Sequence, residues 1–287
     1  MGTHPKGPSR IKDNDKSLAS LIQELPKERV GKAANEQGEL RFLFKVLSAA
    51  QALSIQVHPS LEQAQKGFEE EEKKGPDRNA PNRNYRDSNH KPELICALTP
   101  FVAMCGFRTL NQINELLEPL DLPWLHEWRE KALNDTSSSN DALKKAYIEL
   151  LKFDSSKKNT YSNSLAKTIQ KHIGKKVSKE ELLAYSKQSR LSPYLECLLL
   201  AEYYPGDIAI ISPLLLQLEY LDPGEALFLS AGIPHAYLRG TGLEIMAASD
   251  NVLRGGLTSK HIDMVELEKV MSAEAVEAAQ GKRRGPQ

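Results

Sequence analysis

The stretch GEALFLSAGIPHAYLRG, residues 224–240, joins a turn, an alternating strand and a second turn that ends on a histidine. Apolar residues alternate with others after Glu225, which is typical of a strand with one buried face. The Gly-Ile-Pro turn restricts the backbone that follows it. A rigid turn of this kind aims His235 in one direction, toward the mouth of a β-barrel. The alternative is a histidine that only completes a turn.

Strand-like patterns lie on both sides of a long helical block. Before it, residues 40–57 include an alternating run, and ELICALTPFVAMCGF favours two strands broken at Thr99-Pro100. Leucine-rich segments then recur at helical spacing, and strand patterns return after Pro205. We therefore predict an α+β fold, in which an all-helical domain is inserted into one β domain, and the stretch quoted above is a cupin-like motif of that β domain. The predicted boundaries are 1–108 and 205–272 for the β domain, 109–204 for the helical insertion and 273–287 for a frayed tail.

Composition limits the possible partners. The 287 residues carry 38 Lys+Arg and 38 Asp+Glu, so no net charge favours nucleic acid or an anionic membrane. No apolar run is long enough to span a bilayer. The cysteines, Cys96, Cys105 and Cys197, are odd in number and fit neither a disulfide framework nor a cysteine-rich zinc site. We expect Cys96 and Cys105 to be buried thiols of a cytoplasmic enzyme.

Three separate stretches supply candidate metal ligands. Gln56 and His58 are two residues apart in a strand-like run, which puts both side chains on one face of a sheet. Glu93 opens an apolar strand, where a carboxylate is either exposed or needs a partner. Together with His235 they offer two imidazoles, one carboxylate and one amide oxygen, a set that suits Zn²⁺. For His58, simple packing in an apolar strand is the alternative.

Four long blocks carry a family resemblance: FLFKVLSAAQALSIQVHP, NYRDSNHKPELICALTPFVAMCGFR, YYPGDIAIISPLLLQLEYLDPGEALFLSAGIPHAYLRG and LEIMAASDNVLRGGLT. They resemble signature blocks of the type I phosphomannose isomerases. The resemblance implies a zinc site formed by the same four residues. It also implies a cupin-like catalytic domain with a helical insertion. The family's opening β stretch and its second jelly roll have no counterpart here, so the chain is expected to be truncated at both ends.

The implied reaction interconverts mannose 6-phosphate and fructose 6-phosphate, and thereby supplies mannose 6-phosphate for GDP-mannose synthesis and glycosylation. We expect a monomer that binds a small sugar phosphate. The catalytic candidates are Arg254, for a developing oxyanion, and Lys91 or Glu244, for the proton; the sequence does not decide between the last two. Arg254 paired with Asp250, and Glu244 as a buried paired carboxylate, are the alternatives.

Three further residues are candidates for contact with the substrate. Ser54 lies two residues before Gln56 and faces the same way. Tyr237 shares the face of His235 if the strand continues. Lys260 resembles a lysine that contacts phosphate in the family. Lys45 either adds positive charge or is an exposed structural lysine.

Two other functions compete with the isomerase. A truncated cupin can bind zinc or a sugar phosphate without turnover. A different zinc or iron cupin enzyme, such as a dioxygenase, is the third reading. The glutamine ligand and the cations Lys91, Arg254 and Lys260 favour a phosphosugar over the dioxygenase, whose metal is usually held by histidines and carboxylates alone.

Overall fold

The computed structural model describes residues 2–4, 7–12, 16–31, 40–134, 139–188, 190–272 and 282–284. Within these residues the strands form one antiparallel system, in the order β5-β4-β7-β3-β6-β9, with β1 paired to β7 and β2 paired to β7 and β8. The strands are β1 (Phe42–Ala49), β2 (Ile55–Val57), β3 (Glu93–Ala97), β4 (Phe101–Phe107), β5 (Leu216–Leu221), β6 (Glu225–Leu229), β7 (His235–Ala247), β8 (Leu253–Gly256) and β9 (Lys282–Arg284).

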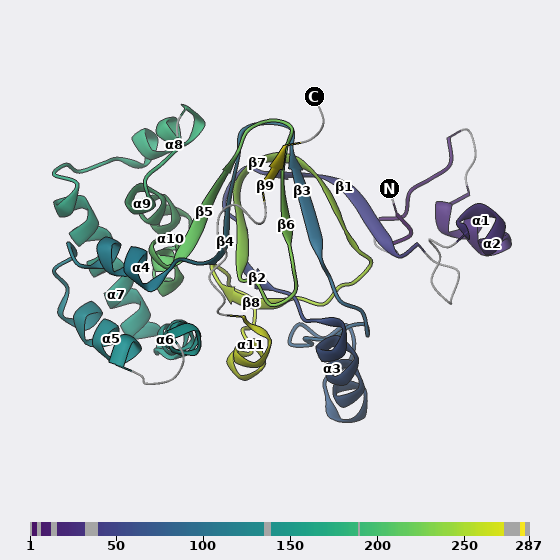
Figure 1. The fold of residues 1–287 in the computed structure, drawn as a ribbon, viewed down its shortest axis with the longest axis horizontal. Coiled ribbons are helices and arrows are strands. Elements are labelled where there is room, and N and C mark those ends of the chain that lie inside the picture. Colours follow the sequence, from purple (N-terminus) through teal and green to yellow (C-terminus); the bar gives the residue numbers. More distant parts are fainter. Residues whose placement is uncertain are drawn as a thin grey trace.

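Most of the helices come from one segment of the chain, which connects two neighbouring strands of the sheet. Helices α4 to α10 all lie in sequence between β4 and β5, which are hydrogen-bonded to each other. Figure 1 shows them grouped on one side of the sheet. The helices are α1 (Leu18–Glu24), α2 (Pro26–Arg29), α3 (Leu61–Lys74), α4 (Leu110–Leu117), α5 (Pro123–Asn134), α6 (Ser139–Lys152), α7 (Ser155–His172), α8 (Lys179–Gln188), α9 (Pro193–Tyr203), α10 (Ser212–Leu215) and α11 (Met264–Val270). The prediction of an α+β fold is confirmed.

Strand β7 holds the sheet system together. Its first residues pair with β2 and β4, and its later residues pair with β1 and β3. Gly240 lies between the two parts, with a φ of +118° that favours glycine. A Cβ there would lie 2.7 Å from the carbonyl oxygen of Pro100, so a side chain cannot be added without movement.

Two apolar cores lie on opposite sides of β4 and the first part of β7. The smaller core contains Ile95, Phe101, Cys105, Leu227 and Tyr237, which come from β3, β4, β6 and β7. The larger core lies between the sheet and the helices, because residues of β2, β4 and β5 pack there with residues of α4 to α10. Side chains that face the smaller core are therefore shielded from solvent. The candidate site described below lies next to this core.

One local prediction is wrong, and one stays a prediction for most of its residues. Within the tail that was predicted to fray, Lys282–Arg284 form β9, which pairs with β6; the rest of 273–287 lies outside the described residues. Backbone hydrogen bonds to a strand edge need no hydrophobic periodicity, so the sequence pattern gave no sign of this strand. Cys96 is half-buried, whereas Cys105 is buried as expected. Successive strand residues face opposite sides, so Cys96 points away from the core that contains Ile95.

Within the described residues, no helix has the length and apolar character needed to cross a membrane.

Candidate metal centre

His58, Glu93 and His235 meet at one point, although they come from distant parts of the sequence. Each offers one ligand atom, and these atoms all lie within 4.8 Å of one another. Glu93 is the first residue of β3, His235 is the first residue of β7, and His58 directly follows β2. All three side chains are buried. Three groups of this chemistry, enclosed together, are able to hold one divalent cation.

Backbone carbonyls fix the orientation of both imidazole rings. His58 Nδ1 lies 2.8 Å from the carbonyl oxygen of Asn251, and His235 Nδ1 lies 2.9 Å from that of Ile233. A carbonyl oxygen only accepts, so each Nδ1 carries the hydrogen and donates it. In a neutral ring this leaves a lone pair on Nε2, as a metal ligand requires.

The two Nε2 atoms face the carboxylate of Glu93. His58 Nε2 lies 3.3 Å from Oε1, and His235 Nε2 lies 3.7 Å from Oε2. Burial lowers the pKa of His58 to about 4, despite the opposing effect of Glu93, so this ring is neutral at pH 7. Its Nε2 is buried without a hydrogen-bond partner. Two sets of lone pairs therefore face each other, and a cation between them would satisfy both.

Gln56 lies beside this group in the sheet. It is directly opposite His235 in the β2–β7 pairing and opposite Arg254 in the β2–β8 pairing. Directly opposed residues in an antiparallel pair share a face, so the Gln56 amide is on the face of His235. The neighbours Ile55 and Val57 are fully buried on the other face, in the larger core.

Lys91 and Tyr237 both contact the Glu93 carboxylate. Lys91 Nζ lies 3.5 Å from Oε1, and the Tyr237 hydroxyl donates to Oε2 over 3.4 Å. Burial raises the pKa of Tyr237 well above its usual value, and the charges of Glu93 and Glu244 add to this effect. The phenol therefore remains protonated and able to donate at neutral pH.

Glu244 is a second buried carboxylate, and its counterion is Lys45. The two are directly opposite in the β1–β7 pairing, and Lys45 Nζ lies 2.8 Å from Glu244 Oε2. Burial raises the pKa of Glu244, and the charge of Glu93 raises it further, while Lys45 lowers it. The reading of Glu244 as a buried paired carboxylate thus describes its geometry, and Lys45, although exposed, supplies the paired positive charge.

Arg254 is half-buried in β8, and its Nη1 donates to Ser54 Oγ over 2.5 Å. Burial lowers the pKa of Arg254, and the charge of Arg86 lowers it further. The predicted alternative, a pair between Arg254 and Asp250, does not occur, and Asp250 lies 3.1 Å from His4 instead. Lys260 is exposed, and in the part of the chain that the structure describes no hydrogen bond or ion pair joins its side chain to the other candidates.

Sequence reasoning missed two residues near the site. Arg86 places a second guanidinium charge near Arg254. Asn251 is fully buried, and its carbonyl oxygen orients His58. Both lie in blocks that bear the family resemblance, but arginine and asparagine in polar loops carry no periodic signal, so only the tertiary structure identifies them.

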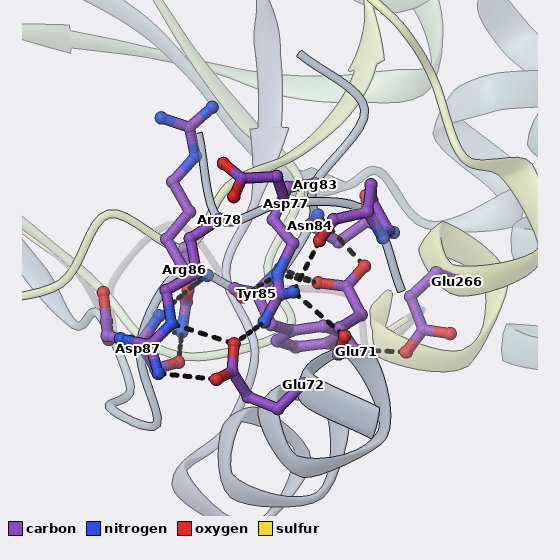
Figure 2. Close-up of polar contacts among 12 residues, drawn as sticks. Glu71, Glu72, Asp77, Arg78, Arg83, Asn84, Tyr85, Arg86, Asp87 and Glu266 are labelled. Atoms are coloured by element: carbon purple, nitrogen blue, oxygen red, sulfur yellow. Dashed lines mark hydrogen bonds and ion pairs between the residues drawn. The ribbon is translucent and has the colours of Figure 1, made fainter. Parts of the chain in front are cut away.

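The loop between α3 and β3 is fastened at its base by two ion pairs of the buried Arg83 side chain. Arg83 lies 2.8 Å from carboxylate oxygens of both Glu71 and Glu72, and it donates to the carbonyl oxygen of Tyr85 over 2.6 Å. The Tyr85 hydroxyl donates to Glu266 over 2.6 Å, which attaches the loop to α11. Figure 2 shows this network, with the Arg86 guanidinium pointing away from it. The network thus holds the segment that leads to Lys91 and Glu93.

The fold and this cluster define a class: an α+β protein whose antiparallel sheet encloses a histidine–carboxylate centre of metal-binding type, with cations nearby. Comparisons with known proteins place the chain more narrowly. The sequence model "Phosphomannose isomerase type I, catalytic domain" matches residues 1–110. Mannose-6-phosphate isomerase of Escherichia coli is 40% identical over 286 residues, which cover 98% of this chain and 67% of that protein. The chain belongs to the type I phosphomannose isomerase family.

Other relatives agree with this placement. Mannose-6-phosphate isomerase of Salmonella typhimurium is 42% identical over 271 residues, covering 93% of this chain and 64% of the relative. A crystal structure of a variant of that organism's phosphomannose isomerase matches with a TM-score of 0.83 at 39% identity, covering 98% of this chain and 67% of that chain. A zinc-bound mannose 6-phosphate isomerase matches at 0.78 with 39% identity and the same coverage. The chain thus spans about two thirds of the length of these relatives.

Proposed function

We propose that this chain is a zinc-dependent aldose–ketose isomerase that interconverts mannose 6-phosphate and fructose 6-phosphate. The observation that carries the proposal is the buried His58 Nε2, which has no hydrogen-bond partner and faces the Glu93 carboxylate. This arrangement fits a divalent cation and is unfavourable without one. A zinc-bound relative of the same family supports the choice of metal.

Four residues would hold the zinc: Gln56, His58, Glu93 and His235. Their donors are two neutral imidazoles, one carboxylate and one amide oxygen, all of which zinc accepts. A bound zinc would supply Lewis-acid stabilisation of an oxyanion on the sugar. One carboxylate against a divalent ion leaves the centre with a net positive charge, which favours an anionic intermediate and a phosphorylated substrate.

The isomerisation removes a proton from one sugar carbon and returns it to the next, so the protein must hold that proton in between. Lys91 and Glu244 are the candidates. Lys91 lies against Glu93, and Glu244 is buried with its pKa raised, which is the direction a base acting near neutral pH requires. The geometry supports both residues equally.

The remaining candidates suit the substrate's charges. Arg254 supplies a permanent positive charge to an oxyanion, and its contact with Ser54 keeps the guanidinium on the face of Gln56. Ser54 and Lys260 would bind the phosphate, and the Tyr237 hydroxyl would orient a sugar oxygen. Lys260 is the least supported of these, because it is exposed and separate from the other residues.

The same proposal includes the finer description of the fold. The β part, residues 1–108 and 205–272, would be a cupin-like jelly-roll domain, and residues 109–204 an inserted helical domain. The strand pairing supports this division, because the chain leaves the sheet after β4 and returns to it at β5, and these two strands pair with each other. We further propose a cytoplasmic monomer that supplies mannose 6-phosphate for GDP-mannose synthesis and binds no nucleic acid.

A coupled assay tests the function directly. The purified chain, loaded with zinc, should convert mannose 6-phosphate to fructose 6-phosphate, and a chelator should abolish turnover until zinc is returned. Zinc binding without turnover would instead support a non-catalytic binding module. A chain that neither binds zinc nor turns over the substrate would rule out both readings.

A further inference from the structure

We propose that Asn251 is a positioning residue, which orients His58 and at the same time holds the segment that leads to Lys91 and Glu93. The inference rests on the proposed zinc site and deepens it. Asn251 follows β7 in the turn before β8 and is fully buried. Its backbone and its side chain contact two different parts of the site.

The backbone of Asn251 sets the ring of His58. Its carbonyl oxygen accepts the hydrogen of His58 Nδ1 over 2.8 Å, which keeps the hydrogen off Nε2. A shift of this carbonyl would therefore change both the direction of the ring and the tautomer that it prefers.

The side chain of Asn251 clamps the segment 86–89. Its Oδ1 accepts from the backbone N–H groups of Arg86 over 2.7 Å and Asp87 over 3.2 Å. Its Nδ2 donates to the carbonyl oxygens of Asp87 over 2.7 Å and Asn89 over 2.9 Å. Every donor and acceptor of the amide is thus used, which a buried amide needs to avoid a desolvation cost.

The side chain of Asp87 accepts hydrogen bonds from the turn that carries Asn251. Its Oδ2 accepts from the backbone N–H of Asp250 over 2.7 Å, and its Oδ1 accepts from the Ser249 hydroxyl over 2.8 Å. The turn and the segment are therefore joined in both directions. The base of the same loop is held separately by Arg83, so the Asn251 contacts act at the end nearer the metal ligands.

The variant Asn251→Asp changes this clamp with almost no change in size. One carboxylate oxygen still accepts from Arg86 and Asp87, but the other replaces Nδ2 and opposes two carbonyl oxygens. We expect the turn to shift and zinc to bind about 10- to 100-fold more weakly, the usual effect of losing an outer partner of a ligand. Zinc affinity is measured by competition with a chelator, without any substrate.

Asn84→Asp is the matched control. Asn84 lies in the same loop, and its Nδ2 donates to Asp263 over 2.9 Å, so the substitution also sets oxygen against oxygen. It does not touch His58, and we expect zinc affinity within about twofold of the unmodified chain even where thermal stability falls equally. Equal loss of zinc affinity in both variants, or no loss in Asn251→Asp, would overturn the proposal.

A second variant covers the case in which Asn251→Asp does not fold. Asp87→Ala removes the hydrogen bonds from Ser249 and Asp250 and leaves the His58–Asn251 bond in place, so we expect zinc binding to weaken, by at most about tenfold, the lower end of the usual range for an outer partner. Unchanged affinity would overturn the inference. Failure of the proposed function itself is distinguishable, because it would appear as an absence of zinc binding in the unmodified chain.

Discussion

At the scale of single residues, Glu244 shows how its neighbours control a buried acid. Burial is the main cause of its raised pKa, the charge of Glu93 adds to it, and Lys45 opposes both. A carboxylate that acts as a base must be deprotonated, so its pKa sets the acidic limb of kcat/KM. Lys45 therefore widens the pH range in which Glu244 can accept a proton.

Lys45→Met should move that acidic limb to higher pH. Removing the cation raises the pKa of Glu244 further, so a larger fraction of Glu244 is protonated at any given pH below neutrality. The measurement is the pH profile of kcat/KM for mannose 6-phosphate. Lys131→Met is the control, because Lys131 forms an equally short but exposed pair with Glu127 in α5. An acidic limb that stays in place or moves to lower pH would exclude Glu244 as the base.

Two further substitutions separate metal binding from proton transfer. His235→Ala removes a proposed zinc ligand and should abolish zinc retention after dialysis. Lys91→Ala should retain zinc but lower kcat by about 10²- to 10⁴-fold, the contribution typical of a general acid or base. Zinc content and kcat are measured on the same samples. Full activity in either variant would contradict the assigned role.

At the scale of elements, strand patterns predicted which stretches carry the candidate ligands but not how these residues meet. Alternation predicted that Gln56 and His58 share a face and that a turn aims His235, because both are local properties of the backbone. Their meeting depends on β7 pairing with β2 and β3, which are far away in the sequence, and no local pattern encodes that pairing. The ion pair of Lys45 with Glu244 was missed for the same reason.

Gly240 allows β7 to cross between its two sets of partners, so Gly240→Ala should be strongly destabilising. The alanine would meet both an unfavourable φ and the carbonyl oxygen of Pro100, a cost of about 2–4 kcal/mol in unfolding free energy. Gly174→Ala is the control, because Gly174 has a φ of +72° but nothing within 4 Å of an added Cβ. It should lose only about 1 kcal/mol. Denaturant titration gives both values, and equal losses would show that close approach to β4 is unimportant.

At the scale of the whole molecule, the sheet and the helices share one core, and a buried ion pair crosses between them. Arg239 of β7 lies 2.7 Å from Glu196 of α9, whose side chain is 1% exposed. The order of strands and helices predicted an interruption of the sheet by helices, but not this shared core, because its contacts join residues of β2 and β4 to helices that follow much later. The helices are therefore expected to sense zinc binding in the sheet.

Heating tests this coupling. The two tryptophans, Trp124 and Trp128, both lie in α5, so their fluorescence reports only on the helices. Zinc at about 100 times its Kd adds about 2.7 kcal/mol, which corresponds to a rise in Tm of roughly 4–5 °C for a chain of this size. Tryptophan fluorescence and far-UV circular dichroism should shift together. A fluorescence midpoint that zinc leaves unchanged would mean that the helices unfold independently.

X-ray absorption at the zinc edge tests the central claim most directly, because it reports the atoms around the metal. The zinc-loaded chain should show one zinc per chain with a shell of nitrogen and oxygen at roughly 2.0–2.1 Å. The outer-shell scattering of two imidazoles should be present, and His58→Ala should remove one of them. A sulfur shell at roughly 2.3 Å, or zinc without imidazole scattering, would contradict a centre formed by His58, Glu93 and His235.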